Sequence, residues 1–311
     1  MKKKITKILE SVPWLYFVGA FFHMLYLAVK HRSLKMIVFS PPGHFYSTIP
    51  SMKEVGENSA VIFDKSKPVL GVSINEDEQL SLLREFSQYY GDLPFSEQSE
   101  SDLRYYYNNP FFGYGDGIVL YSFLRHFKPS RVVEVGSGYS SALMLDTDES
   151  FLNGETEFVF IEPYSERLRG LLRKKELAKL DILESPVQSV DKAVFTDLNA
   201  GDILFIDSSH VVKIGSDVDY LLSQILPVLK PGVIIHFHDV LWPFEYPESW
   251  VRQGRSWNEA YFIRTFLQYN SDFEIMVFNS YIGDVHPKEL ALNLPLCSKM
   301  PGGSIWLRKV L

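Results

Sequence analysis

The residues best suited to chemistry follow two apolar segments in the second half of the chain. One segment, DILFID, ends on Asp207, and His210 lies just beyond it. The other, GVIIHFHDV, carries His238 and Asp239 near its end. Carboxylates and imidazoles bind divalent cations. An imidazole, with a pKa of about 6.5, can also accept a proton at neutral pH. A single acid after a strand is more often the cap of the next helix.

The elements that must position these residues are short apolar segments that alternate with helical patterns. The helical patterns cover residues 75–86, 117–127 and 218–229, and a basic helical stretch is expected over 165–180. The apolar segments predict strands at residues 131–135, 157–162, 181–185, 202–207, 232–240, 273–278 and 304–310. This alternation is typical of an α/β fold with a mostly parallel sheet, which binds ligands beyond the carboxyl ends of its strands.

The strands that end near Asp207 and Asp239 are expected to be neighbours, because one helical crossover joins them. Asp207, His238 and Asp239 would then form a mixed oxygen and nitrogen ligand set. Oxygen ligands suit Mg²⁺ or Mn²⁺, and an imidazole ligand also suits Fe²⁺ or Zn²⁺. The alternatives are that Asp207 caps a helix and that His210 is a solvated loop residue. Two adjacent strand ends with an acid and an imidazole favour a functional site.

A glycine-containing turn, EVGSGYSS, follows the strand over 131–135. Glycines at such a turn let a ligand approach the backbone, and the N–H groups of the next helix face that ligand. Glu162 follows the next strand, where a carboxylate can accept hydrogen bonds from ribose hydroxyls. Ser141 stands where a nicotinamide fingerprint has its third glycine, which argues against a nicotinamide oxidoreductase.

Together, the segments VVEVGSGYSS, FIEP, GDILFIDSSH, LPVLKPG and HFHDV resemble class I S-adenosylmethionine-dependent methyltransferases. The branch they are similar to contains small-molecule and sugar O-methyltransferases, including the macrocin-type and catechol-type enzymes. The resemblance covers residues 105–311. It implies a Rossmann-like seven-stranded sheet, mostly parallel, with helices on both faces and an antiparallel last strand.

The resemblance also implies roles for individual residues. The methionine part of S-adenosylmethionine would be bound by Glu134, Gly136, Ser137 and Gly138, and Glu162 would bind its ribose.

In metal-dependent relatives the positions of Asp207, His238 and Asp239 bind Mg²⁺, so Mg²⁺ or Mn²⁺ is expected here. His210 would be the general base that takes the proton of the acceptor hydroxyl, with Asp207 beside it. His238 is a departure, because relatives usually carry an acid there.

The methyl acceptor is expected to be a small molecule or a glycan, such as a natural product or polysaccharide. The segment after Asp239 is rich in aromatic residues, whose faces suit sugar rings or planar acceptors. Loops containing His44, Tyr46, Asn109 and Asp116 are further candidates for a lid. Two other functions remain open: a metal-dependent hydrolase, and a non-catalytic scaffold anchored by the N-terminal segment.

The composition limits the partners and the compartment. The net charge of −7 and the pI of about 5.7 argue against nucleic-acid binding. A single cysteine, Cys297, fits a reducing compartment, so a cytoplasmic location is expected. The sequence leaves open whether the chain forms a homo-oligomer.

Three regions are expected: a basic and apolar N-terminal helix over 1–35, an extension with lid-like loops over 36–104, and the methyltransferase domain over 105–311. The apolar run over 13–29 has basic residues on both sides and no clear cleavage site, so a cleaved signal peptide is disfavoured. It predicts a packed or interfacial helix that contacts a membrane surface, or a short membrane span.

Overall fold

The computed structural model describes residues 22, 25–26, 39–99, 102–174, 176–177 and 179–311. The chain divides into two compact units, Met1–Glu57 and Asn58–Leu311. The described part of the first unit contains the short helix α3 (Met52–Glu57) and a loop with exposed aromatic side chains, and Phe22, Leu25 and Tyr26 are also helical. Of the apolar run over 13–29, all but Phe22, Leu25 and Tyr26 lies outside the described residues. No helix in the described ranges is both long and apolar enough to cross a membrane.

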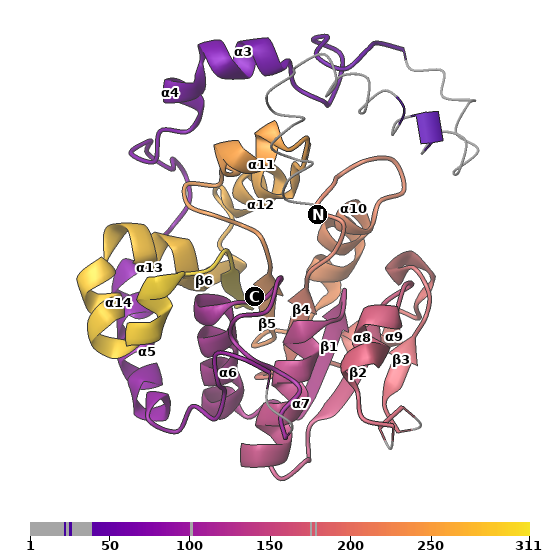
Figure 1. Ribbon diagram of the computed structural model, residues 1–311, viewed down its shortest axis with the longest axis vertical. Coiled ribbons are helices and arrows are strands. Elements are labelled where there is room, and N and C mark those ends of the chain that lie inside the picture. The colour runs from indigo at the N-terminus through magenta and orange to yellow at the C-terminus, as the bar shows by residue number, and fades with distance from the viewer. Residues whose placement is uncertain (1–21, 23–24, 27–38, 100–101, 175, 178) are drawn as a thin grey trace. The chain divides into compact units, whose positions relative to one another are not determined.

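The second unit is built on one sheet of seven strands in the order β3-β2-β1-β4-β5-β7-β6 (Figure 1). The strands are β1 (Arg131–Val135), β2 (Glu157–Ile161), β3 (Asp181–Leu183), β4 (Ile203–Ile206), β5 (Ile234–Phe237), β6 (Phe273–Phe278) and β7 (Ile305–Lys309). All seven fall on the segments where the sequence predicts strands. β7 runs antiparallel to both of its neighbours, β5 and β6, while the pairs among β1 to β5 are parallel. The predicted sheet with an antiparallel last strand is therefore confirmed.

Helices cover both faces of this sheet. The α-helices of the second unit are α4 (Ser59–Ile62), α5 (Glu76–Tyr90), α6 (Tyr114–Phe127), α7 (Tyr139–Phe151), α8 (Glu166–Leu171), α9 (Ala193–Thr196), α10 (Asp217–Tyr220), α11 (Glu248–Arg252), α12 (Glu259–Leu267), α13 (Asn279–Val285) and α14 (Pro287–Asn293). Helical turns of other types are η2 (Val187–Ser189), η3 (Leu221–Ile225), η4 (Leu226–Val228) and η5 (Pro295–Lys299). From β1 the chain moves to β2 on one side, and from β4 it moves to β5 on the other. Because such crossovers are right-handed, α7 and α10 lie on opposite faces.

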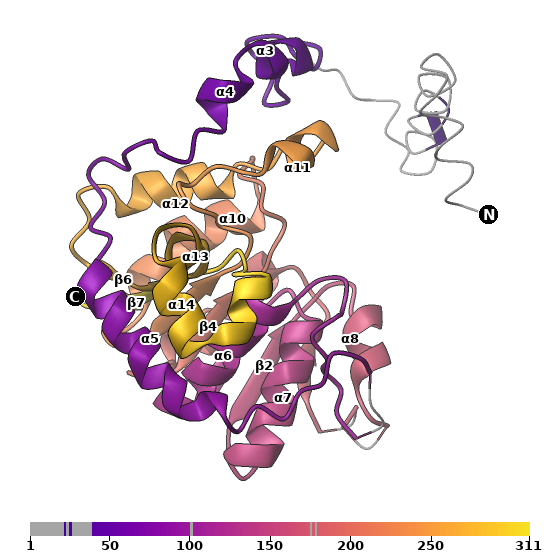
Figure 2. The same cartoon turned by 60° about the vertical axis from the view of Figure 1, so that its left-hand side comes forward.

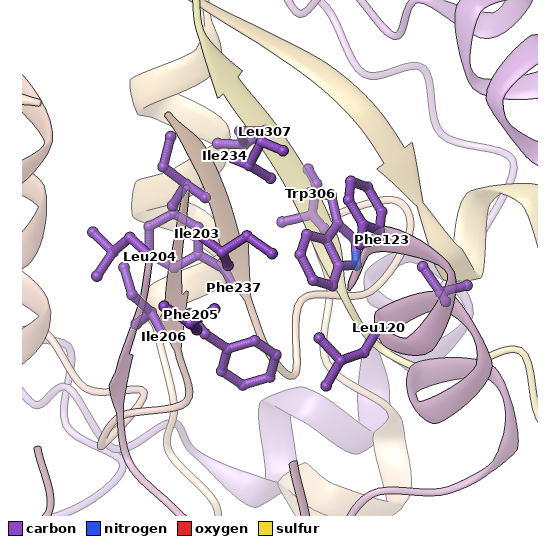
Figure 3. Close-up of a cluster of buried hydrophobic side chains, with 14 of the residues drawn as sticks. Leu120, Phe123, Ile203, Leu204, Phe205, Ile206, Ile234, Phe237, Trp306 and Leu307 are labelled. Carbon is purple, nitrogen blue, oxygen red and sulfur yellow. The ribbon is translucent and has the colours of Figure 1, made fainter. Parts of the chain in front are cut away.

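The central core is formed where α6 packs on the middle of the sheet (Figure 3). The ring of Phe123 stacks on that of Trp306 with centroids 3.8 Å apart. Phe205 and Phe237 come from adjacent strands and are fully buried. Because both faces of β4 and β5 are covered, their residues form continuous apolar runs rather than an alternating pattern.

One sequence-based boundary needs correction: the helical stretch expected over 165–180 ends early, because α8 ends at Leu171. The compact unit that contains the sheet begins at Asn58, so it includes the second half of the extension expected over 36–104. The reason is that α5 packs against α6, β6 and α14, which places the second half of the expected extension in the same unit (Figure 2).

Candidate active site

The glycine turn between β1 and α7 is held tightly against the end of β4. Gly136 has a φ of +85°, and a Cβ at this position would lie 1.7 Å from the backbone oxygen of Asp207. Only glycine fits such a contact, since both the backbone conformation and the space exclude a side chain. The turn thus places the backbone of Gly136, Ser137 and Gly138 along one wall of a cavity of about 660 Å³.

Glu134 stabilises this turn from the interior of the fold. Its carboxylate is buried and accepts hydrogen bonds from the hydroxyls of Ser140, at 2.5 Å, and Ser141. Burial raises the pKa of Glu134 to about 8, although these hydrogen bonds oppose the shift. Glu134 is not among the residues that line the cavity. Its contacts with the two hydroxyls position the turn, and its expected contact with the methionine part of the cofactor stays a prediction.

Glu162 follows β2 and lies where two cavities meet. Its carboxylate accepts the backbone N–H of Ser137 at 3.2 Å and that of Tyr164 at 2.7 Å. The second cavity, of about 390 Å³, extends from Glu162 between the loops after β2, β3 and β4, and Ile161 and Val187 form part of its apolar lining. An apolar slot beside a carboxylate suits an adenine ring and its ribose.

Asp207 and His238 lie next to each other because their strands pair in register, Ile206 opposite Phe237. His210 Nε2 is 3.3 Å from Asp207 Oδ1 and 3.8 Å from Asp239 Oδ2. The predicted juxtaposition of the two strand ends is thus present in the structure. The side chain of Asp207 contacts an imidazole rather than a helix terminus, and Ser216 caps α10 instead.

His210 and Asp239 both have left-handed backbone conformations, with φ of 59° and 56°. This region is costly for residues other than glycine, and such residues cluster at functional sites, where the surrounding structure maintains them. In His210 this conformation accompanies a side chain that lies between two strand-end carboxylates.

Glu259, at the start of α12, completes this cluster and is a residue that the sequence did not indicate. Its Oε2 lies 2.8 Å from His210 Nδ1, and the carboxylate is buried, with the residue 1% exposed. The backbone N–H groups of Asn258 and Glu259 donate to the oxygen of His210. A carboxylate at Nδ1 assigns the proton to that nitrogen, so Nε2 faces Asp207 and Asp239. From the sequence alone, Glu259 is indistinguishable from any acid in the first turn of a helix.

The charges of this cluster are strongly coupled. Burial lowers the pKa of His210, but the hydrogen bonds with Asp207 and Glu259 outweigh burial and raise it well above its usual value. Burial raises the pKa of Asp207, but His238 and His210 outweigh burial and lower it. Burial lowers the pKa of His238 as well, yet Asp207, Asp239 and Asp116 raise it overall.

The predicted metal ligands have suitable chemical types but not a suitable arrangement. Within the described ranges no three His, Cys, Asp or Glu side chains are placed so that they could hold a metal ion. His210 lies between the carboxylates of Asp207 and Asp239. Binding of a cation by Asp207, His238 and Asp239 therefore stays a prediction from the sequence.

The segment after Asp239, which is expected to contact the acceptor, lines two of the cavities. A third cavity, of about 430 Å³, shares His238, Asp239 and Trp250 with the first and reaches the buried carboxylate of Asp116. Trp250 and Trp257 line the first cavity.

Several other residues of these segments have structural roles in the fold. Among the aromatic residues after Asp239, Phe244 and Tyr246 are buried in the core. Asn109 hydrogen-bonds the backbone of its own loop. His44 and Tyr46 belong to the first unit, so their expected role in a lid stays a prediction.

The chain is similar to several known proteins. Residues 133–240 match the family model described as a methyltransferase domain. An uncharacterized protein of Archaeoglobus fulgidus is 38% identical over 164 residues, which cover 51% of this chain and 73% of that protein. The SAH-bound methyltransferase PaMTH1 of Podospora anserina is 16% identical, with 85% of this chain and 98% of that chain covered and a TM-score of 0.38.

The O-methyltransferase TomG of Streptomyces achromogenes, in complex with SAM, is 17% identical, with 84% of this chain and 100% of that chain covered and a TM-score of 0.39. The domain match includes the glycine turn, Glu162, Asp207 and the strand end at Asp239. Residues 133–240 of the chain are thus a methyltransferase domain.

Proposed function

We propose that the protein transfers a methyl group from S-adenosylmethionine to a hydroxyl oxygen of a small molecule or glycan, with His210 as the general base. The observation that carries this proposal is the pair of contacts made by one imidazole. Nδ1 is held by Glu259, while Nε2 faces the strand-end carboxylates that line the cavity. An imidazole with Nδ1 held by a buried carboxylate and Nε2 beside two carboxylates that line the cavity is suited to exchange a proton with an acceptor.

The cofactor-binding residues fit this reaction. The backbone of the Gly136 to Gly138 turn is open to the cavity, and Glu162 stands at the junction with the apolar slot. When bound, S-adenosylmethionine supplies a methyl group already activated on a sulfonium centre. The chain must therefore align an oxygen with that methyl group and remove the proton of that oxygen.

The acceptor-side residues supply the proton transfer. Neutral His210 accepts the proton at Nε2, and the buried carboxylate of Glu259 stabilises the imidazolium that results. Asp207 and Asp239 add negative charge near the same nitrogen. Burial lowers the pKa of His210, but Asp207 and Glu259 raise it overall, so the neutral form that acts as base becomes populated only as the pH approaches that raised value.

A labelled-methyl assay tests this function directly. Methyl transfer from labelled S-adenosylmethionine is measured against a panel of hydroxyl compounds that includes nucleotide sugars, glycans and catechols. We expect transfer to oxygen in at least one of these classes. Binding of S-adenosylhomocysteine without transfer to any hydroxyl compound would contradict the proposal and favour the non-catalytic scaffold.

Assistance by Mg²⁺ or Mn²⁺ through Asp207, His238 and Asp239 supplements this proposal as a prediction from the sequence. It is supported by the ligand types alone, and the imidazoles would have to rearrange to admit a cation. Assays in EDTA, with Mg²⁺ or Mn²⁺ added back, test it. Loss and recovery of activity would support a bound cation, whereas full activity in EDTA would rule it out.

The remaining expectations concern the surroundings of the enzyme. A membrane-surface contact through residues 13–29, a cytoplasmic location and a homo-oligomer stay predictions. Vesicle flotation of the full chain, compared with a chain starting at Asn58, tests the first of these.

A further inference from the structure

Arg255, which lines the first cavity, is half-buried and forms no ion pair with a carboxylate of the described residues. Among the arginines that the structure describes, Arg84, Arg167, Arg255 and Arg264 form no ion pair with an acid. Three of them are exposed, whereas Arg255 is half-buried. Arginines are seldom removed from water unless they are paired, because the loss of hydration is costly. The partner of Arg255 is therefore expected to come from outside the chain.

Arg104 differs from Arg255 because acids of the chain surround it. Arg104 is buried, and its guanidinium forms ion pairs with Asp146, Glu149 and Glu176. That cluster is complete within the fold, so it needs no ligand. Arg255, by contrast, lines the open cavity that contains the base.

Two indole rings hold the Arg255 guanidinium in place. Its Cζ lies 4.6 Å from the ring centroid of Trp250 and 5.0 Å from that of Trp257. The backbone N–H of Arg255 also donates to the oxygen of Trp250 at 3.1 Å. Cation–π contacts offset part of the desolvation, but they do not satisfy the guanidinium N–H donors. The result is a preorganised group with donors still available.

The position of this guanidinium relates it to the acceptor rather than to the cofactor. The ring of Trp257 that it contacts packs on His210, with centroids 4.3 Å apart. Trp250, its other contact, lines both the first cavity and the acceptor-side cavity. Arg167, the other arginine of the first cavity, instead lies beside the cofactor turn, where a Cβ on Gly138 would be 3.2 Å from its Cδ.

We propose that Arg255 binds an anionic group of the methyl acceptor, so that the acceptor is a hydroxyl compound that also carries a carboxylate or a phosphate. This inference rests on the proposed function and adds the charge of the substrate to it. A guanidinium can bind either group through two parallel N–H donors, which would fix the acceptor relative to His210. The tryptophans beside it would contact the acceptor ring.

The test uses acceptor pairs that differ only in charge: protocatechuate against its amide, glucuronate against glucose, and glucose phosphate against glucose. Binding of each compound to the protein loaded with S-adenosylhomocysteine is measured by calorimetry, and labelled-methyl transfer is measured in parallel. The variants are R255Q and R255K, with R252Q as the matched control. Arg252 is exposed on α11, is paired with Glu248 and does not line the cavities.

We expect the unmodified protein and R252Q to prefer the anionic member of at least one pair by about tenfold or more. R255Q should lose that preference, R255K should keep part of it, and the affinity for S-adenosylhomocysteine should stay within about twofold. Three results would overturn the inference: equal binding within every pair, an unchanged preference in R255Q, or a loss of cofactor affinity in R255Q. Charge-selective binding without methyl transfer would contradict the proposed function but not the anion site.

Discussion

The two halves of the active site are built by different means. On the cofactor side, at the ends of β1 and β2, the main determinants are backbone features: a turn that admits only glycine at Gly136 and an acid held by two N–H groups. On the acceptor side, at the ends of β4 and β5, the determinants are side chains from distant segments, such as Glu259 on His210. Backbone requirements leave a local signal in the sequence, whereas a side chain that arrives from a distant helix does not.

The cofactor side should fail through folding when its backbone is changed. Gly136→Ala places a Cβ against the backbone oxygen of Asp207, in a conformation that side chains avoid. We expect the free energy of unfolding to fall by about 3 kcal/mol, with S-adenosylhomocysteine binding lost. Denaturant unfolding and calorimetry measure the two effects.

Gly170→Ala is the control, because a Cβ at Gly170 meets nothing within 4 Å. It should leave the free energy of unfolding unchanged or raise it by up to about 1 kcal/mol. Equal stability of the two variants would contradict the backbone account.

The acceptor side should fail through catalysis when a side chain is changed. Glu259→Gln removes the charge that holds His210 Nδ1, so we expect kcat to fall by about 100-fold, with the affinity for S-adenosylhomocysteine unchanged. Glu248→Gln, in which a half-buried acid on α11 outside the cavities is replaced, should behave like the unmodified protein. A Glu259→Gln variant with normal kcat would show that the buried carboxylate has no part in the reaction.

The pH dependence should report the same contact. Because Asp207 and Glu259 raise the pKa of His210 against the effect of burial, the base is protonated at low pH. We expect kcat/KM to rise about tenfold per pH unit until the pH exceeds this raised pKa, and then to level off.

In Glu259→Gln this pKa should fall, so the rise in kcat/KM should move to lower pH. The charged pair also contributes stability below the usual histidine pKa, which is lost as the pH rises through the raised value. A pH profile with no rise, or one that is the same in both proteins, would contradict the assignment.

A smaller effect is expected at Glu162. Glu162→Gln replaces one acceptor oxygen by a donor facing a backbone N–H, and it should weaken S-adenosylhomocysteine binding by about tenfold. Glu166→Gln, in the first turn of α8, changes an exposed acid outside the cavities and should leave this affinity unchanged. Equal affinities of the two variants would remove Glu162 from the cofactor site.

The same division explains how much the sequence could predict. The strands are readable because a parallel strand buried on both faces is a short apolar run. The meeting of Asp207 with His238 follows from one crossover between neighbouring strands. An acid beside a glycine turn gives no sign of whether it faces the cavity or the core, so the buried contacts of Glu134 with Ser140 and Ser141 could not be predicted. Arg255 lies in the loop between α11 and α12, and Glu259 lies at the start of α12, where their contacts are set by tertiary packing.

His210 is the residue at which the central claim is tested most directly. In His210→Ala and His210→Gln, single-turnover methyl transfer and S-adenosylhomocysteine affinity are measured on the same protein samples. The account predicts that the rate of transfer falls by about 100-fold to 10,000-fold while the cofactor affinity stays within about threefold. Transfer at a normal rate in either variant would contradict the assignment of His210 as the base.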